Sequence, residues 1–413
     1  MNARERVNAS MAHREPDRVP LFELAFSTKH ANTILKKECF FPRSGGLNLK
    51  KILQYNQAGR EERLQSIISG VNTQIEVYNR FGYDIMPLIP TEFIQPVNGS
   101  FGLFGSNYLL DVTIEDLGCN SWKVSGDDGF WSIFSYNEKS DVFYALDDSI
   151  KQGGIDELAR YVDKLESLSA ELNQHTKDAL IATKTAVEHP LVKSGELYLL
   201  GHCDICMTGA EAGYEVFLEA FALEPELIDR YFAATTTGLL PVLSEQLNLG
   251  VDGIIAANDW CYKTGPIISP YCFDTMMAPY LKIIADKTHA AGKPFIKHLD
   301  GNVSLILDTL VDKVGIDALH SIEPSAGMDI FSLKEKYGDR ISIWGNLDSG
   351  ELMMNKTTGE VEDYCKKLIR KCAPGGGFIM STSNCIHDNI PLDNVFAMID
   401  ACNMYGKYPI CVS

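Results

Sequence analysis

The second half of the chain alternates between short apolar runs and amphipathic segments, and this rhythm limits the fold more than any other feature of the sequence. From residue 196 onwards, six apolar runs of strand length are each followed by a segment whose apolar residues have helical spacing. Parallel strands need long crossover connections of this kind, so the pattern indicates consecutive β-α units in one parallel sheet. The six runs are ELYLLGHCD (196–204), DGIIAANDW (252–260), KPFIKHLDG (293–301), IDALHSIEP (316–324), RISIWGNLD (340–348) and GGFIMSTSNC (376–385).

Two further runs, at about 19–24 and 83–89, also have strand character and bring the expected number of strands to eight. A (β/α)8 TIM barrel is the natural closure of eight such units, and an open doubly wound sheet is the alternative. No glycine-rich phosphate loop follows the first run, which disfavours a dinucleotide-binding sheet. We therefore expect an α/β protein with a single barrel domain over residues 1–413.

Two segments lie outside this rhythm. An N-terminal extension forms a predicted helix that ends by Pro16. Residues of about 96–150 contain short alternating stretches such as SWKVSGDDGFWSIFSY, which predict a β-hairpin insert near the barrel mouth. Its aromatic side chains would either pack a ring-bearing substrate or form a small core of their own, and they are Phe101, Phe104, Trp122, Phe130 and Trp131.

Charge and cysteine content narrow the class of protein. Lys and Arg number 37 against 55 Asp and Glu, a net charge of −18 that repels nucleic acids and anionic membranes. The N-terminal stretch is polar, without the apolar core of a signal peptide, and no apolar run approaches the ~20 residues of a membrane span. The 11 cysteines are an odd number and are scattered, as is typical of reduced thiols. We expect a soluble cytoplasmic protein.

Polar or metal-binding residue types stand at nearly every predicted strand end. In a (β/α)8 barrel the chemistry lies at the carboxyl ends of the strands, so these side chains should converge on one mouth. Burying them together costs stability unless function retains them. They are Glu23, Asp84, His202, Cys203, Asn258, Asp259, His298, Asp300, Glu323, Asn346, Asp348, Asn384 and Cys385.

Among these residues, the best-defined candidate site is a zinc site. His298, Glu323 and Cys385 come from three strand ends and supply donors that zinc accepts, with Asp300 as a fourth ligand or a supporting partner. The alternative is a polar mouth in which His298 and Asp300 bond to each other and to loop amides. The pair Cys203 and Cys206 has C-x-x-C spacing, but no second pair accompanies it, so a metal or redox role there is less supported.

Several motifs resemble the uroporphyrinogen decarboxylase superfamily, in order and over nearly the whole chain. They are HREPDRVPLFE, GYDIMP, HLDG, WGNLD and SNCIHDNIPLDNV. The resemblance implies a single (β/α)8 barrel with its cleft at the strand carboxyl ends. The superfamily contains decarboxylases that use no cofactor, and methyltransferases that exchange methyl groups with corrinoid proteins, usually through zinc.

The decarboxylase branch fits less well. Its members carry an early arginine-rich stretch that binds substrate carboxylates, and here NQAGR (56–60) resembles only part of it and lies past the first strand. A porphyrinogen with eight carboxylates is also a poor electrostatic match for a chain of charge −18. Metal-free decarboxylation, with Asp84 at the pyrrole nitrogens, is the main alternative. Methyl transfer from a methylcorrinoid to a thiol or a folate is another.

The methyltransferase branch carries a His-x-Cys pair and a later Cys as zinc ligands, with an exchangeable Glu in some members. By position, His298 matches the His, Cys385 the later Cys and Glu323 the Glu, while Asp300 replaces the first Cys. A carboxylate in place of a thiolate makes the metal a harder Lewis acid, suited to an oxygen ligand. We predict a zinc-dependent methyltransferase that demethylates a methoxy compound onto the Co(I) corrinoid of a partner protein, as in anaerobic O-demethylation.

The predicted methyltransferase function gives each candidate side chain a role. The corrinoid rides on a separate protein, because the corrinoid-binding pattern D-x-H-x-x-G is absent here. Barrels of the superfamily are often dimers or monomers, so a homodimer is possible. The predicted acid–base residues are Asp84, Asp259, Asp300 and His387; the predicted metal ligands are His298, Asp300, Glu323 and Cys385; and the predicted substrate-binding residues are Glu23, His202, Asn258, Asn346 and Asp348.

Overall fold

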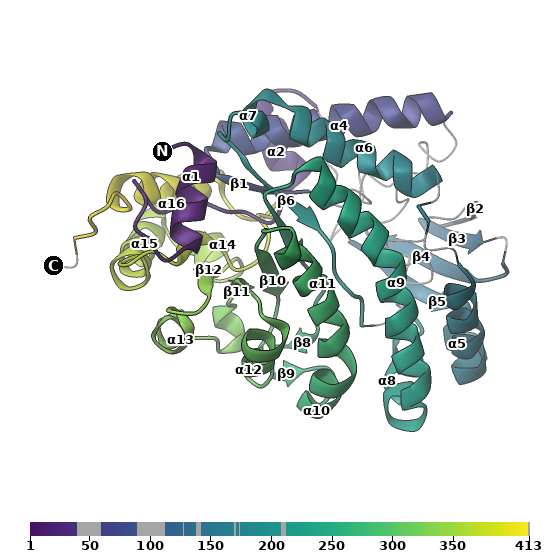
Figure 1. Ribbon diagram of the computed structural model, residues 1–413. Coiled ribbons are helices and arrows are strands. Elements are labelled where there is room, and N and C mark those ends of the chain that lie inside the picture. Colours follow the sequence, from purple (N-terminus) through teal and green to yellow (C-terminus); the bar gives the residue numbers. More distant parts are fainter. Residues whose placement is uncertain are drawn as a thin grey trace.

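The centre of the protein is a parallel sheet of seven strands in the order β1-β6-β7-β10-β11-β12-β13 (Figure 1). The computed structural model describes residues 1–38, 59–88, 112–126, 128–137, 142–168, 171–172, 174–207 and 212–411. The strands of the sheet are β1 (Ile85–Pro87), β6 (Tyr198–His202), β7 (Gly253–Ala256), β10 (Phe295–Leu299), β11 (Ala318–Ser321), β12 (Ser342–Leu347) and β13 (Phe378–Thr382).

Residues 21 and 22 close this sheet into a ring. Leu21 bridges Met380 of β13, and Phe22 bridges Ile85 of β1, both in parallel. The expected strand at 19–24 is therefore only two isolated bridges, which corrects its predicted length. Pro20 offers no amide hydrogen, so it accepts from Met380 N at 3.0 Å but cannot donate to the ladder. The predicted TIM-barrel fold is confirmed.

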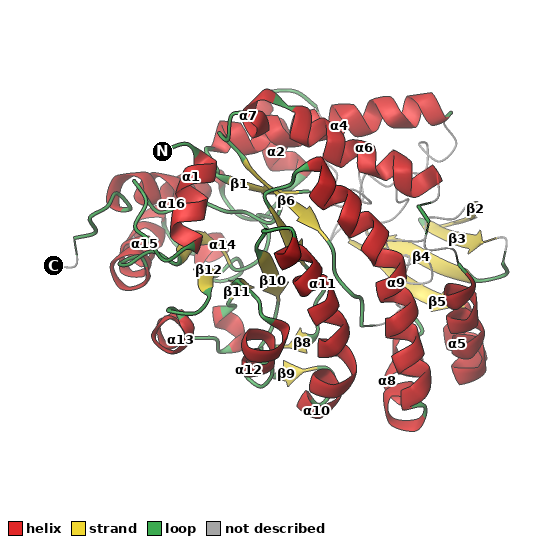
Figure 2. Cartoon of the chain, in the orientation of Figure 1, coloured by secondary structure: helices red, strands yellow, loops and turns green. Residues whose placement is uncertain are grey.

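Helices follow the strands and pack outside the sheet (Figure 2). None of them within the described ranges is both long and apolar enough to cross a membrane. The described part of the chain also contains two π-helical turns, 273–277 and 310–314, and a 3-10 turn, 324–326. The helices are α1 (Ala3–Met11), α2 (Thr28–Leu35), α4 (Arg60–Phe81), α5 (Ser149–Ser167), α6 (Gln174–Glu188), α7 (Pro190–Lys193), α8 (Tyr214–Leu223), α9 (Pro225–Leu249), α10 (Pro270–Cys272), α11 (Ala278–Ala290), α12 (Leu307–Thr309), α13 (Ile330–Tyr337), α14 (Leu352–Asn355), α15 (Thr358–Cys372) and α16 (Leu392–Tyr405).

The inside of the barrel is filled by apolar side chains, with at least one from every strand. Because successive side chains of a strand point to opposite faces, the inward residues alternate along each strand. The inward cluster is Val7, Phe22, Leu24, Ile85, Tyr198, Leu200, Ile255, Ile296, Ala318, Trp344 and Ile379. Ile296 belongs to it, so the side chain two positions later, at the carboxyl end of β10, also faces inward.

Helix α1 closes the amino end of the barrel. Its Val7 joins the interior cluster, and its Ser10 Oγ donates to the Phe378 carbonyl at 3.0 Å. Gly377 N donates back to Ser10 O at 2.8 Å, just before β13. The opposite, carboxyl end is therefore the one left for chemistry.

The insert is larger than the β-hairpin predicted for it. It forms a four-stranded antiparallel sheet in the order β2 (Val112–Gly118), β3 (Ser121–Gly126), β4 (Trp131–Asn137) and β5 (Val142–Asp148). Asp148 at its end accepts from Gly213 N at 2.6 Å, in the segment that follows β6. The sheet therefore lies on the carboxyl side of the barrel.

Aromatic residues of this insert serve partly as core. Phe130 is buried and stacks edge-on against Tyr161 of α5, at 5.4 Å between ring centroids. Trp131 is half-buried and lies under the ammonium of Lys123. Trp122 packs against the same apolar core, whereas the predicted aromatic positions Phe101 and Phe104 lie outside the described residues.

Candidate metal centre

His298 stands at the inner face of the barrel mouth. It is the fourth residue of β10 and its side chain is only 3% exposed. β10 ends at Leu299, and Gly301 in the following turn has φ +82°. A Cβ there would lie 2.6 Å from the Tyr262 carbonyl of β8 (Cys261–Tyr262). This close approach turns the chain so that Asp300 returns toward the His298 ring.

The parallel register of β10 and β11 places His320 beside His298. The two Nδ1 atoms lie 2.7 Å apart, and His320 Nε2 lies 3.1 Å from the Thr382 carbonyl. Burial, with a smaller contribution from His298, lowers the pKa of His320 well below its usual 6.5. A carbonyl only accepts, so neutral His320 donates from Nε2 and accepts at Nδ1. His298 therefore donates from Nδ1, and in neutral His298 the lone pair is on Nε2.

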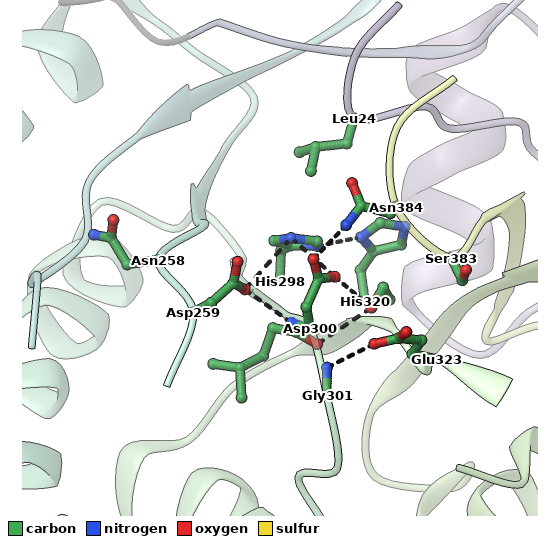
Figure 3. Close-up of polar contacts among 12 residues, drawn as sticks. Leu24, Asn258, Asp259, His298, Asp300, Gly301, His320, Glu323, Ser383 and Asn384 are labelled. Atoms are coloured by element: carbon green, nitrogen blue, oxygen red, sulfur yellow. Dashed lines mark hydrogen bonds and ion pairs between the residues drawn. The ribbon is translucent and has the colours of Figure 1, made fainter. Parts of the chain in front are cut away.

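Two carboxylates face this lone pair. His298 Nε2 lies 3.6 Å from Asp300 Oδ1 and 3.8 Å from Asp259 Oδ1 (Figure 3). Asp259 follows β7 and is about half exposed, whereas Asp300 is more enclosed. Within the described residues, Asp259, His298 and Asp300 form a group whose ligand atoms all lie within 4.8 Å of one another.

Backbone and side-chain donors hold both carboxylates in this orientation. Asp300 N donates to Asp259 Oδ1 at 2.8 Å, and Ser321 Oγ of β11 donates to Asp300 Oδ1 at 3.1 Å. Asn384 Nδ2, after β13, donates to the other oxygen of Asp300 (Figure 3). The donors that hold the two carboxylates thus come from the carboxyl ends of three strands, β10, β11 and β13.

This arrangement suits a cation. With His298 neutral and both carboxylates ionised, the three ligand atoms present only lone pairs to one another, and a positive charge between them stabilises such a cluster. One imidazole and two carboxylates are accepted ligands of Zn²⁺, and they leave a coordination position for a substrate atom. The donor set therefore fits the zinc that the sequence predicts.

The structure brings together only part of the predicted ligand set. Of the predicted ligands, His298 and Asp300 lie together, and Glu323 and Cys385 lie outside this group of ligand atoms. The third member of the group is Asp259, which the sequence predicted as an acid–base residue. Glu323 Oε2 accepts from Gly301 N at 3.0 Å, and its other oxygen accepts from Ser325 Oγ. Glu323 thereby holds the turn that carries Asp300. Cys385 is half-buried and packs against the apolar interior cluster.

Sequence reasoning missed His320 and Ser321, which support the group from the next strand. The available signal was the pair HS in IDALHSIEP, which could have been aligned with KHL of the preceding strand. A shift of the register by one residue would turn both side chains to the opposite face, and the sequence does not specify that register.

Glu23 lies behind this group, fully buried. The Thr382 hydroxyl lies 2.9 and 3.0 Å from its two oxygens, and Leu24 N donates to it at 3.1 Å. Burial raises the pKa of Glu23 from its usual 4.5 to about 8, although these hydrogen bonds lower it. The same Thr382 accepts from His320 through its carbonyl, so Glu23 and His298 are linked through two intermediate residues.

The other predicted substrate-binding residues take part in the framework of the mouth. Asn346 is buried and donates to Ile322 O at 3.0 Å, while Asp348 accepts from Glu351 N at 2.5 Å. The backbone of His202 pairs with the Gln246 side chain, at 2.9 and 2.8 Å.

Two further predicted residues lie in the loops of this face. Asn258 Oδ1 accepts from Cys206 Sγ at 3.3 Å, and Asn258 points away from Asp300 in Figure 3. His387 Nδ1 accepts from Asn389 N at 3.3 Å within a turn. Contacts of these residues with a substrate or a proton stay predictions.

Asp84 is not at the mouth, which corrects its expected place at a strand end. It precedes β1, at the amino end of the barrel, and is 3% exposed. Its carboxylate is 2.6 Å from Arg6 Nη1 and 2.7 Å from Arg18 Nη1, and it accepts from Leu21 N at 2.8 Å. The strand begins one residue after Asp84, because β1 pairs with β6 only over Ile85–Pro87.

Comparisons with known proteins agree with this fold. A solved structure, a methyltransferase from Methanosarcina mazei, superposes with a TM-score of 0.61 over 98% of each chain, at 16% identity. Uroporphyrinogen decarboxylase from Myxococcus xanthus is 25% identical over 171 residues, which are 41% of this chain and 45% of the relative. The enzyme of that name from Coxiella burnetii (strain Dugway 5J108-111) is 23% identical over 237 residues, which are 54% and 61%.

These alignments span about half of the length of the curated relatives. A family model described as uroporphyrinogen decarboxylase (URO-D) matches residues 202–405, from the end of β6 through α16. That range contains Asp259, His298, His320 and Asp300. Over residues 202–405, the chain is therefore similar to the uroporphyrinogen decarboxylase family.

Proposed function

We propose that the protein is a zinc-dependent methyltransferase that moves a methyl group from a small methoxy compound to the Co(I) corrinoid of a partner protein. The observation that carries this proposal is the position of His298 Nε2, 3.6 Å from Asp300 and 3.8 Å from Asp259. Its hydrogen bond to His320 turns a lone pair toward both carboxylates. The likeness of the fold to a solved methyltransferase adds support.

Demethylation of an ether requires that the negative charge developing on its oxygen be stabilised, because an alkoxide or phenoxide is a poor leaving group. A zinc ion at Asp259, His298 and Asp300 would supply a Lewis acid that stabilises the charge developing on that oxygen. The C–O bond breaks with its electron pair kept by oxygen, which then takes up a proton. The methyl carbon accepts the electron pair of Co(I) to form the new Co–C bond.

The chain's own residues prepare this site. His320 keeps His298 in the tautomer whose Nε2 faces the mouth, and Ser321 and Asn384 orient the Asp300 carboxylate. Asp259, about half exposed, is the member of the group most open to a substrate. Carboxylate ligands in place of thiolates favour an oxygen-bearing substrate over a thiol.

Metal-free decarboxylation of a porphyrinogen or a smaller acid is the second candidate, since the curated relatives carry that name. In that reading Asp84 would meet the pyrrole nitrogens. Its burial at the amino end, between Arg6 and Arg18, argues against this role. The acidic group at the mouth also disfavours a substrate rich in carboxylates.

Metal analysis and corrinoid spectroscopy test the proposal. We expect about one zinc per chain, and conversion of a Co(I) corrinoid to its methylated form with at least one methoxy compound. Asp259→Asn, His298→Ala and Asp300→Asn should each weaken metal binding and lower methyl transfer together. Asp163→Asn, an exposed carboxylate of α5, is the control that should keep both. Turnover of a porphyrinogen by the metal-free protein would support decarboxylation instead.

A further inference from the structure

A fully buried ion pair lies next to the proposed metal centre. Lys297 precedes His298 in β10, and its ammonium lies 2.6 Å from Asp204 Oδ2, in the segment after β6. Both side chains are 0% exposed. Burying two charges is expensive, and an apolar pair of similar volume is often as stable, so packing alone does not account for this pair.

Both charges bond to the backbone of the loop that carries Asp259. Lys297 Nζ donates to the carbonyls of Asn258 at 2.8 Å and Ala256 at 3.3 Å. Asp204 Oδ2 accepts from Asn258 N at 2.7 Å. The carbonyl and the amide of the residue just before Asp259 are therefore both held by the pair.

The residue after Asp259 is held by the same ammonium. Trp260 is fully buried, and Lys297 Nζ lies 3.8 Å from the centroid of its ring. Asp204 Oδ1 accepts from Ile205 N at 2.8 Å, which anchors the carboxylate on its own segment. The residue before Asp259 and the residue after it therefore both contact Lys297. The Asp259 carboxylate itself lies near His298 Nε2.

We propose that Lys297 and Asp204 are positioning residues that set the place of Asp259 in the metal centre. This inference rests on the proposed function, because it treats Asp259 as a ligand. The ion pair supplies directional bonds at a fixed point of the loop, which an apolar pair of the same size cannot provide. It follows that the pair should influence metal binding through Asp259, and not through stability alone.

A double-mutant cycle with Co²⁺ as the probe tests this inference on the full-length protein. Lys297→Met should weaken Co²⁺ binding by about 10–100-fold, and the visible Co²⁺ spectrum should change as it does in Asp259→Asn. In the Asp259→Asn background, Lys297→Met should cause little further loss. Asp204→Asn, which keeps the side-chain size, should repeat this pattern if Lys297→Met does not fold.

Asp252→Asn is the matched control. Asp252 is also a buried carboxylate that accepts a backbone amide, from Leu199 at 2.9 Å, and pairs with Arg4 at 2.7 Å. It precedes β7, the strand whose other end leads to Asp259. It should lower stability without changing Co²⁺ affinity.

The outcomes separate the two proposals. Equal losses with and without Asp259, or no loss at all, would overturn the positioning role while leaving the metal centre intact. A wild-type protein that binds no Co²⁺ would overturn the metal centre and this inference together.

Discussion

The Nδ1 atoms of His298 and His320 lie 2.7 Å apart, on opposite positions of the neighbouring strands β10 and β11. The second nitrogen of His320 is oriented toward the Thr382 carbonyl at 3.1 Å. This contact decides which nitrogen of His320 accepts, and thereby which nitrogen of His298 is presented to the mouth. A fully buried side chain outside the group of ligand atoms thus determines the ligand atom of the proposed centre.

His320→Phe should therefore weaken Zn²⁺ binding by about 10–100-fold, the usual loss when the partner of a metal-bound histidine is removed. Phenylalanine keeps the ring volume but offers no acceptor to His298 Nδ1. A competition titration against a chromophoric chelator measures the affinity. His320→Asn, which retains an acceptor near Nδ1, should recover part of the loss. Equal affinities in the two variants would show that the acceptor is unimportant.

Glu23 should make stability depend on pH. Its pKa is about 8 in the folded protein against 4.5 for an ordinary Glu, so folding favours the protonated form. The stabilisation is complete below the lower value and is lost as the pH rises through about 8. The free energy of unfolding should fall by up to about 1.4 kcal/mol per pH unit from this group within that window.

Urea unfolding at several pH values measures this dependence. Glu23→Gln mimics the protonated carboxyl, so its curve should be flatter than that of the wild type. Glu196→Gln, at an exposed position, should leave the dependence unchanged. Parallel curves for wild type and Glu23→Gln would mean that Glu23 does not titrate in this range.

Gly301 and Gly315 form a matched pair for testing the turn after β10. Both have positive φ, +82° and +81°, so alanine strains both by about 1 kcal/mol. At Gly301 the new Cβ would also lie 2.6 Å from the Tyr262 carbonyl, whereas at Gly315 the nearest atom is 3.9 Å away. Gly301→Ala should lose about 1–3 kcal/mol more than Gly315→Ala and should also weaken metal binding. Equal losses of unfolding free energy in the two variants would contradict the close contact.

Asp84→Asn tests the role of the amino-end ion cluster. The substitution leaves Arg6 and Arg18 without a charged partner at this position, and both are largely buried. The free energy of unfolding should fall by about 3 kcal/mol, the range for a broken buried pair. A loss of turnover with unchanged stability would instead support the catalytic role that the sequence suggested.

The barrel could be predicted from the sequence because strand and helix periodicities differ and alternate regularly after residue 196. The same regularity placed His298 and Asp300 at the mouth, since a glycine turn directly follows an apolar run. The prediction was wrong for Asp84, which lies at the beginning of its apolar run, one residue before β1, and therefore at the amino end of the barrel. Local patterns do not define such boundaries, because pairing with β6 decides them.

What the sequence determined by itself is therefore the fold and the placement of His298 and Asp300 at the barrel mouth. Only the tertiary structure showed that Asp259 lies beside these two residues and that His320 orients His298. It also showed that Lys297 and Asp204 bond to the loop that carries Asp259. These contacts join residues that lie between 22 and 93 positions apart in the chain, as for His298–His320 and Lys297–Asp204. They depend on strand register and loop closure, which are properties of the assembled barrel and not of any one segment.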